Sequence, residues 1–140
     1  MSLYPDTNIV CSFLFQDVHT GDVERWLANS SAPLVISDWT RTEVYALAHR
    51  RVRGGHLSED DAGFGLMVFD GILLGEALPL PLSASAGRLA SELARDPVLK
   101  LSAADALHLA CATDAGCVLV TLDARLAEAA RRRGYALETP

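Results

Sequence analysis

The fold of this chain is decided by residues 116–138, which read GCVLVTLDARLAEAARRRGYALE. A glycine precedes the apolar run VLVTL, which has the length and composition of a buried strand. Asp123 follows that run at the start of a helical segment, and Gly134 ends the helix before a second short apolar run. Strands that alternate with helices in this way predict a mostly parallel sheet covered by helices.

The same alternation runs through the rest of the chain. We expect strands at 3–5, 33–37 and 76–82, the last at a sheet edge because its two prolines cannot serve a central ladder. Between the strands, the spacing of apolar residues predicts helices over 8–15, 18–28, 38–52, from Ser58 onward, 83–95 and 102–115. We therefore predict a single domain over residues 1–140 with an α/β fold, a three-layer α/β/α arrangement around a mostly parallel central sheet.

The composition of the chain restricts its expected cellular location. Half of its residues are hydrophobic (50%), yet no apolar stretch approaches the roughly 20 residues that a membrane helix requires. The start, MSLYPDTNIV, lacks the basic region of a signal peptide. Cys11, Cys111 and Cys117 lie in apolar surroundings without metal-ligand spacing, so we expect buried thiols in a reducing cytoplasm.

Residues 102–112, SAADALHLACA, pose a chemical question. A helix of this composition is apolar nearly all round and belongs in the core, but it carries Asp105, a side chain rarely buried without a partner. Three other acids have comparable positions: Asp6 and Asp123 directly follow predicted strands, and Glu43 lies six residues past Ser37 in the next helix. With right-handed crossovers, all four reach the carboxyl ends of the strands, where ligands bind in such sheets.

Each acid also has an explanation as a helix cap or a surface residue. Ser102 and Asp105 match a loose capping box, Asp123 suits the N-cap of the last helix, and Asp6 or Asn8 suits that of the first. Glu43 fits a solvated helix face. Capping alone does not explain why the acids converge at the ligand-binding edge, and it does not exclude that they bind a ligand as well.

Convergent carboxylates predict a metal site. Carboxylates brought within a few ångström repel one another and lose hydration, at a cost of several kcal/mol. Mg²⁺ or Mn²⁺ removes that cost, because these hard cations prefer oxygen ligands. Such a cation activates water and neutralises charge on a phosphodiester. The sequence has no Gly-rich phosphate loop and no Ser-His-Asp or Cys-His constellation, which agrees with this chemistry.

Four segments together resemble the signature segments of PIN-domain ribonucleases, most closely the bacterial VapC-type toxins of type II toxin–antitoxin pairs. They are YPDTNIV at the start, SDWTRTEVYALA around Glu43, SAADALHLACA and LVTLDARL. The resemblance covers essentially the whole chain, and the size, order and spacing of the segments agree. It implies a PIN-like domain that is a Mg²⁺- or Mn²⁺-dependent endoribonuclease acting on RNA, homodimeric, and inhibited by a cognate VapB-like antitoxin. From the composition, no membrane partner is expected.

The resemblance also implies roles for individual residues. By position, four acids match the family's catalytic and metal-binding quartet: Asp6, Glu43, Asp105 and Asp123. Thr7, Asn8 and Thr121 match the supporting polar positions. Pro5 departs from the family pattern, which has an ordinary apolar residue there, and it predicts a short first strand because proline removes a backbone donor.

Other polar residues are assigned from their positions. His108 lies one turn after Asp105, and we favour a satisfied core histidine over a site residue. Arginines 50, 51, 53 and 131–133 end helices, where the dipole favours positive charge. Eleven of the twelve basic residues are arginine, a bidentate phosphate ligand, and Arg41 and Arg125 are the expected RNA-backbone contacts because they lie near the acidic positions.

Competing functions require different residues at defined positions in the sequence. A receiver domain requires paired acids after the first strand and a late lysine, and the only lysine, Lys100, is not at a strand end. A haloacid-dehalogenase-like phosphatase requires a second aspartate where Asn8 stands. A nuclease acting on DNA and a PIN fold used as a non-catalytic scaffold remain as alternatives. The net charge of −6 excludes a surface that traps nucleic acid generally, so any nucleic-acid contact is local.

Overall fold

The computed structural model describes the backbone of residues 1–140 and every side chain except that of residue 72. Two parallel sheets form its centre: β1, β4 and β5 in one, and β2 and β3 in the other, joined by a parallel bridge between Leu3 and Leu34. The strands are β1 Leu3–Pro5, β2 Val35–Ser37, β3 Leu78–Leu80, β4 Val118–Val120 and β5 Leu137–Glu138. The expected edge strand is confirmed, because β3 pairs only with β2.

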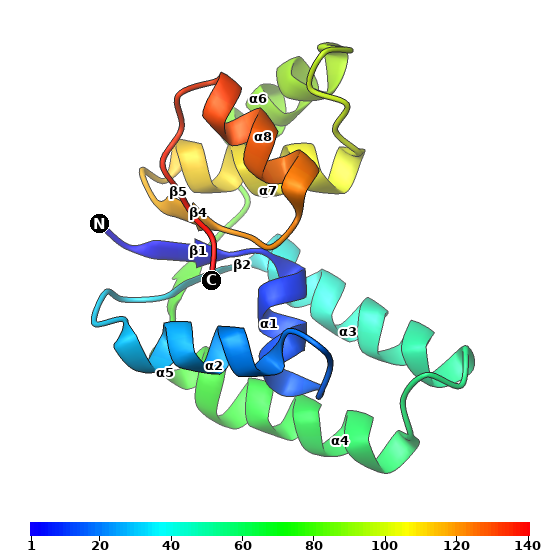
Figure 1. Ribbon diagram of the computed structural model, residues 1–140. Helices are drawn as coiled ribbons and strands as arrows, with labels where there is room; N and C mark the ends of the chain where they lie inside the picture. The colour runs from blue at the N-terminus through cyan, green and yellow to red at the C-terminus, as the bar shows by residue number, and fades with distance from the viewer.

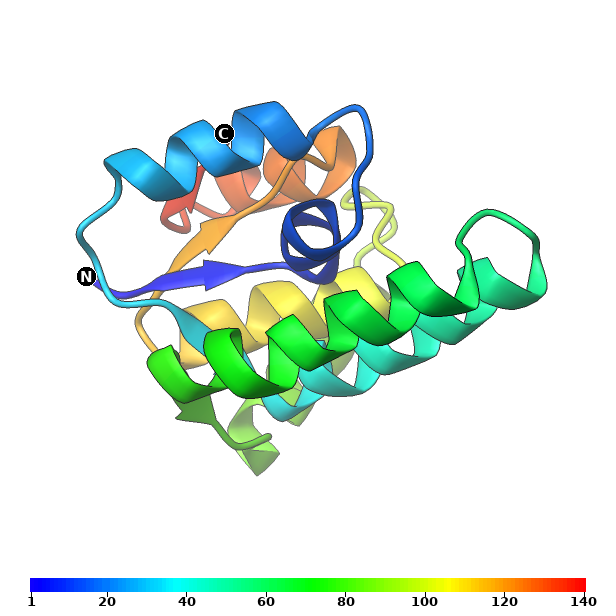
Figure 2. The ribbon, with the colours of Figure 1, turned by 90° about the horizontal axis from the view of Figure 1, so that it is seen from below.

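Helices cover both faces of the strands, as the sequence predicts. Figures 1 and 2 show α6, α7 and α8 on one side and α1 to α4 on the other, with α4 packed alongside α3. The helices are α1 Thr7–Leu14, α2 Thr20–Asn29, α3 Asp38–Arg53, α4 Glu59–Val68, the π-helix η1 Phe69–Leu73, α5 Leu74–Glu76, α6 Ala84–Arg95, α7 Ala103–Asp114 and α8 Ala124–Arg132. The three-layer α/β/α prediction is therefore confirmed.

Alternating side chains of the short strands supply the two halves of the core. Tyr4 and Leu119 point into the cluster formed with α6, α7 and α8. Their neighbours Leu3 and Val120 point the other way, into a cluster with α1 and α2. Because successive strand residues face opposite sides, three residues per strand suffice to bind both helical layers to the sheet.

Polar residues and glycines mark the helix boundaries. Ser58 accepts a hydrogen bond from the N–H of Asp61 at the start of α4, which confirms the predicted helix start. Gly116 and Gly134 follow α7 and α8 with φ of 64° and 68°, a conformation that a residue with a Cβ rarely adopts. These two glycines turn the chain directly into β4 and towards β5.

One segment differs from the expectation of a single helix after Ser58. The chain continues from α4 through the π-helix η1 into α5 before it reaches β3. Phe69 is fully buried at this change of helix type and packs edge-on against the ring of Tyr45, with centroids 5.7 Å apart. The Tyr45 hydroxyl donates to Asp70, so contacts with α3 hold the π-turn in place.

Two expectations from composition can be compared with the structure. Cys11, Cys111 and Cys117 are buried free thiols, as predicted. Among the described residues, no helix combines the length and apolar character that crossing a membrane requires.

Close packing of α4 on α1 yields a stability prediction. A methyl group at Gly65 would meet the Phe15 ring, 2.7 Å from Cδ1, and the Leu14 carbonyl oxygen at 3.1 Å. We expect Gly65→Ala to lower the free energy of unfolding by about 1–3 kcal/mol, as overpacking does. The matched control is Gly63→Ala in the same helix, where space is open, and it should raise that free energy by about 0.5–1 kcal/mol. Urea denaturation measures both, and equal effects would contradict this packing.

Candidate active site

Asp6 is a carboxylate buried where β1 ends, with 3% of its surface exposed. Its Oδ1 accepts the N–H of Ile9 at 2.9 Å, which makes Asp6 the N-cap of α1. The Thr121 hydroxyl donates to Oδ2 at 2.5 Å. Burial raises the pKa of the Asp6 carboxyl above its ordinary value, although both hydrogen bonds act to lower it. The capping interpretation of Asp6 is therefore confirmed, but a cap alone does not require a buried charge.

Thr121 connects Asp6 to the start of α8. It is fully buried just after β4, and its hydroxyl oxygen accepts the N–H of Asp123 at 2.9 Å while its hydrogen goes to Asp6. Asp123 in turn caps α8, because its Oδ1 accepts the N–H groups of Arg125 and Leu126, each at 2.8 Å. A single threonine thus places two of the predicted site acids relative to each other, and the charge of Asp123 acts to raise the pKa of Asp6.

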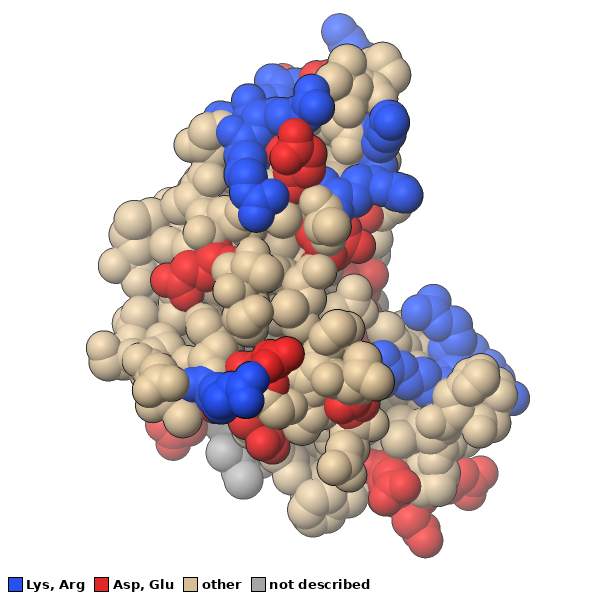
Figure 3. Space-filling model, viewed as in Figure 1, with Lys and Arg blue, Asp and Glu red and all other residues tan. Residues whose placement is uncertain are grey.

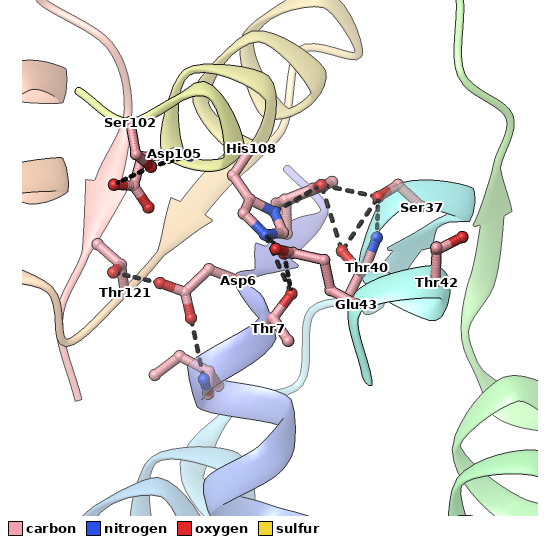
Figure 4. Close-up of polar contacts among 12 residues, drawn as sticks. Asp6, Thr7, Ser37, Thr40, Thr42, Glu43, Ser102, Asp105, His108 and Thr121 are labelled. Atoms are coloured by element: carbon pink, nitrogen blue, oxygen red, sulfur yellow. Dashed lines mark hydrogen bonds and ion pairs between the residues drawn. The ribbon is translucent and has the colours of Figure 1, made fainter. Parts of the chain in front are cut away.

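Glu43 reaches the same region from α3. The Thr7 hydroxyl donates to Glu43 Oε2 at 2.6 Å, and His108 Nε2 lies 2.6 Å from the same oxygen (Figure 4). Burial acts to raise the pKa of the Glu43 carboxyl, but the hydrogen bonds from His108 and Thr7 outweigh it and hold that pKa below its ordinary value. Glu43 is therefore a charged, oriented carboxylate whose side chain is 25% exposed.

Asp105 lies in the first turn of α7 and is half-buried. Ser102 accepts the N–H of Asp105 at 3.1 Å and donates its hydroxyl hydrogen to Asp105 Oδ2 at 2.8 Å. This reciprocal pair confirms that Ser102 caps α7, although the carboxylate bonds the Ser102 hydroxyl rather than its backbone. The question posed by an acid in an apolar helix has a local answer, since Asp105 stands at the polar end of α7 and not in its middle. Figure 4 shows its carboxylate on the side of Asp6 and Thr121.

The structure brings these acids to one edge of the sheet through intermediate residues rather than as a closed cluster. Among the described side chains, no three His, Cys, Asp or Glu residues are close enough together to hold a metal ion. Each carboxylate is instead bonded to a nearby hydroxyl, amide or imidazole donor. The assignment of the four acids as metal ligands therefore stays a prediction.

The donor set nevertheless has the chemistry that a hard cation requires. In Glu43, Asp105 and Asp123, one carboxylate oxygen accepts the hydrogen bonds, and no described donor reaches the other oxygen. Asp6 is buried, and its described hydrogen-bond donors, the Ile9 N–H and the Thr121 hydroxyl, are uncharged groups. Carboxylate oxygens left free beside a buried carboxyl group whose described donors are uncharged fit Mg²⁺ or Mn²⁺.

Some of the remaining predicted site residues contact the four acids, and others do not. Thr7 and Thr121 contact the acids directly, whereas Asn8 is exposed on α1. Arg41 lies on the side of α3 that faces Tyr45 and Asp70, away from Glu43, because residues two apart point in nearly opposite directions on a helix. Arg125 is exposed beside Asp123, the N-cap of α8.

Two residues of this region were not predicted as site residues. His108 is a buried and fully bonded core histidine, as expected, but it also contacts Glu43 directly. Tyr4 is fully buried in β1 and its hydroxyl lies 3.0 Å from His108 Nδ1. The only signals in the sequence were the one-turn spacing from Asp105 to His108 and a hydroxyl-bearing residue two positions before Asp6.

Comparison with known proteins agrees with this geometry. The model of the PIN domain family matches residues 3–132. No curated protein sequence matches the chain.

Solved structures share the fold. VapC20 from Mycobacterium tuberculosis, a sarcin–ricin loop cleaving toxin, is similar with a TM-score of 0.75 and 18% identity over 99% of both chains. VapBC2 from Rickettsia felis, bound to a DNA fragment from its promoter, has a TM-score of 0.69 and 18% identity over 100% of this chain and 99% of that one. DNA-bound VapBC from Salmonella typhimurium has a TM-score of 0.69 and 21% identity, over 99% of this chain and 98% of the other. At these identities the likeness concerns the fold.

The buried charge of Asp6 predicts a pH-dependent gain from neutralising it. Asp6→Asn keeps an oxygen for the Ile9 N–H, so in EDTA near neutral pH it should raise the free energy of unfolding by about 1–2 kcal/mol. Folding raises the pKa of this carboxyl, so the wild type loses stability as pH rises through that pKa. The advantage of the variant should therefore vanish in acid, below the ordinary aspartate pKa, where the wild-type carboxyl is protonated in both states.

Urea denaturation across this pH range measures the effect. The control is Asp60→Asn at the exposed start of α4, where we expect little change at any pH. A variant at Asp6 that is less stable than the wild type at neutral pH would show that its charge is compensated within the fold.

Proposed function

The chain belongs to the PIN domain family, and from that premise we propose that it is a metal-dependent endoribonuclease acting as the toxin of a type II toxin–antitoxin pair. The observation that carries the proposal is the placement of Asp6, Glu43, Asp105 and Asp123 around the carboxyl ends of β1 and β4. All four lie within the residues that the family model matches.

The four acids would hold a Mg²⁺ or Mn²⁺ ion. When bound, the ion supplies an activated water and neutralises charge on the phosphodiester. The chain's own residues prepare this site by fixing the carboxylates: Thr121 and the Ile9 N–H hold Asp6, and Thr7 orients Glu43. Donors that hold carboxylates in place oppose the repulsion that would otherwise separate them.

The distribution of basic side chains supports the proposal of a polyanionic substrate. Figure 3 shows Lys and Arg gathered on both sides of a notch, over α8 and the α6–α7 connection and at the far end of α3, with carboxylates between them. After burial and the bonds from His108 and Thr7, the charge of Arg50, two turns beyond Glu43 on α3, also acts on the pKa of Glu43 and lowers it. Across the notch, Arg125 lines a hollow of about 390 Å³ together with Lys100 and Arg132. Arginines on both sides of the notch suit a phosphate backbone that crosses the four acids between them.

The partner proposed is a VapB-like antitoxin. The chain shares its fold with proteins solved as VapBC complexes, from Rickettsia felis and Salmonella typhimurium. Phe64 and Met67 on α4 are 64% and 62% exposed, and such apolar surface suits an amphipathic helix of a partner. The homodimer implied by the resemblance stays a prediction, as does residence in the cytoplasm.

Cleavage of RNA tests the proposal. Purified protein is incubated with a pool of tRNA and mRNA and with DNA of matched sequences, in Mg²⁺, Mn²⁺ or EDTA, and the ends are mapped. We expect discrete new ends in RNA with metal, none in EDTA, and a loss of more than about 100-fold in Asp6→Asn and Asp105→Asn, because each removes a ligand charge.

Asp60→Asn is the matched control, because it removes a carboxylate from the exposed start of α4, and it should cut as the wild type does. Cuts in DNA but not RNA would favour a DNA nuclease. Absence of cuts in either polymer would favour a non-catalytic scaffold. Full activity of folded Asp6→Asn and Asp105→Asn would contradict the assignment of the site.

A further inference from the structure

His108 and Tyr4 form a buried connection to Glu43 that the proposed function does not use. We infer that His108, held by the Tyr4 hydroxyl, is a positioning residue that fixes Glu43 with one oxygen bonded and the other left available to a metal ion. This inference rests on the proposed function, because it assigns Glu43 to the metal site. His108 itself is not a ligand in this account.

The hydrogen atoms of the network can be assigned. The Thr7 hydroxyl donates its only hydrogen to Glu43 Oε2, so at the 3.0 Å contact between Thr7 Oγ1 and His108 Nε2 the imidazole is the donor. A carboxylate only accepts, so the 2.6 Å contact from Nε2 to Glu43 Oε2 also requires a hydrogen on Nε2. In the neutral imidazole, Nδ1 is then left to accept from the Tyr4 hydroxyl at 3.0 Å.

Tyr4 is itself held at its far side. Its hydroxyl lies 2.7 Å from Ser37 Oγ, at the end of β2, and also accepts from Thr40 at 3.3 Å. Burial raises the pKa of the Tyr4 hydroxyl well above its ordinary value, so the group stays a neutral donor. The contacts run from Ser37 and Thr40 through Tyr4 to His108 and Glu43. Figure 4 labels Ser37, Thr40, His108 and Glu43 along this line. Residues of β1, α1 and α3 therefore contact one imidazole ring on α7, and β2 is connected to it through Ser37 and Tyr4.

The consequence for Glu43 is a fixed orientation. A glutamate side chain has three rotatable bonds and loses rotamer entropy when it is held in one arrangement. Thr7 and His108 both bond Oε2, and among the described residues no donor reaches Oε1. Fixing one oxygen in this way leaves the other for a ligand. Residues that orient a metal ligand commonly change metal affinity by about 10–100-fold when they are removed.

A purely structural role makes a different prediction. If His108 only fills the core, its removal lowers stability and leaves metal affinity unchanged. If His108 positions Glu43, a variant that keeps the Nε2 donor keeps the affinity. His108→Gln supplies an amide N–H near the position of Nε2, whereas His108→Leu keeps the bulk and supplies no donor.

The test measures Mn²⁺ binding without RNA, by EPR of the free ion, beside unfolding in EDTA for each protein. We expect His108→Leu to weaken Mn²⁺ binding by about 10–100-fold, Tyr4→Phe to weaken it less, and His108→Gln to restore most of it. Leu109→Val, the next residue of α7, trims a fully buried side chain outside the network and should lower stability without changing Mn²⁺ affinity.

The Mn²⁺ affinities of these variants distinguish a failure of the positioning role from a failure of the metal site. Loss of Mn²⁺ affinity in Asp105→Asn, together with wild-type affinity in His108→Leu, would overturn the positioning role and leave the metal site standing. No saturable Mn²⁺ binding by the wild type would overturn both. Equal weakening of Mn²⁺ binding in His108→Leu and His108→Gln would also contradict the positioning role. If His108→Leu does not fold, Tyr4→Phe and His108→Gln are compared with the wild type. Wild-type Mn²⁺ affinity in Tyr4→Phe, or a large loss of affinity in His108→Gln, would then contradict the role.

Discussion

The Asp6 carboxyl group is buried, with 3% of the residue's surface exposed. Burying a carboxylate without a neutralising partner costs several kcal/mol. Two hydrogen bonds, from Thr121 and from the Ile9 N–H, offset part of that cost, and they decide how the strand ends are built. Thr121 must follow β4 beside β1, which requires the parallel pairing of these strands. Because neither bond brings a positive charge, the site keeps an electrostatic demand that a divalent cation would meet.

The residues that end secondary structures here are also the residues of the proposed site. Asp6 and Asp123 cap α1 and α8, and Ser102 caps α7 while bonding Asp105. A capping carboxylate uses one oxygen for the helix N-terminus, and in Asp123 the other oxygen is left without a described donor. Capping and metal binding are therefore compatible roles of one side chain. A substitution at such a position affects stability and chemistry together, so the two must be measured separately.

Local patterns in the sequence were sufficient for the order of the elements, the parallel sheet and the placement of the four acids at one edge of it, because strand ends and helix starts carry characteristic residues. Contacts between distant residues were not predictable in this way. The bond from His108 to Glu43 joins residues 65 positions apart, and no local pattern reports it. Arg41 is near Glu43 in sequence but faces Tyr45 and Asp70, since two residues of a helix turn the side chain away. The π-helix η1 depends on contacts with α3 that the apolar spacing does not encode.

The proposed site requires that the four carboxylates at this edge bind a divalent cation, and metal-dependent melting tests this claim. Wild type and Asp105→Asn are melted in EDTA and across a Mn²⁺ series, with each protein's melting temperature as the readout. We predict that Asp105→Asn is at least as stable as the wild type in EDTA, because one repelling charge is gone. Mn²⁺ should then stabilise the wild type by about 2.7 kcal/mol at a hundred times its dissociation constant, and Asp105→Asn by less at the same concentration. Identical melting temperatures and identical responses to Mn²⁺ in the two proteins would contradict the claim and leave Asp105 with only its contact to Ser102 at the start of α7.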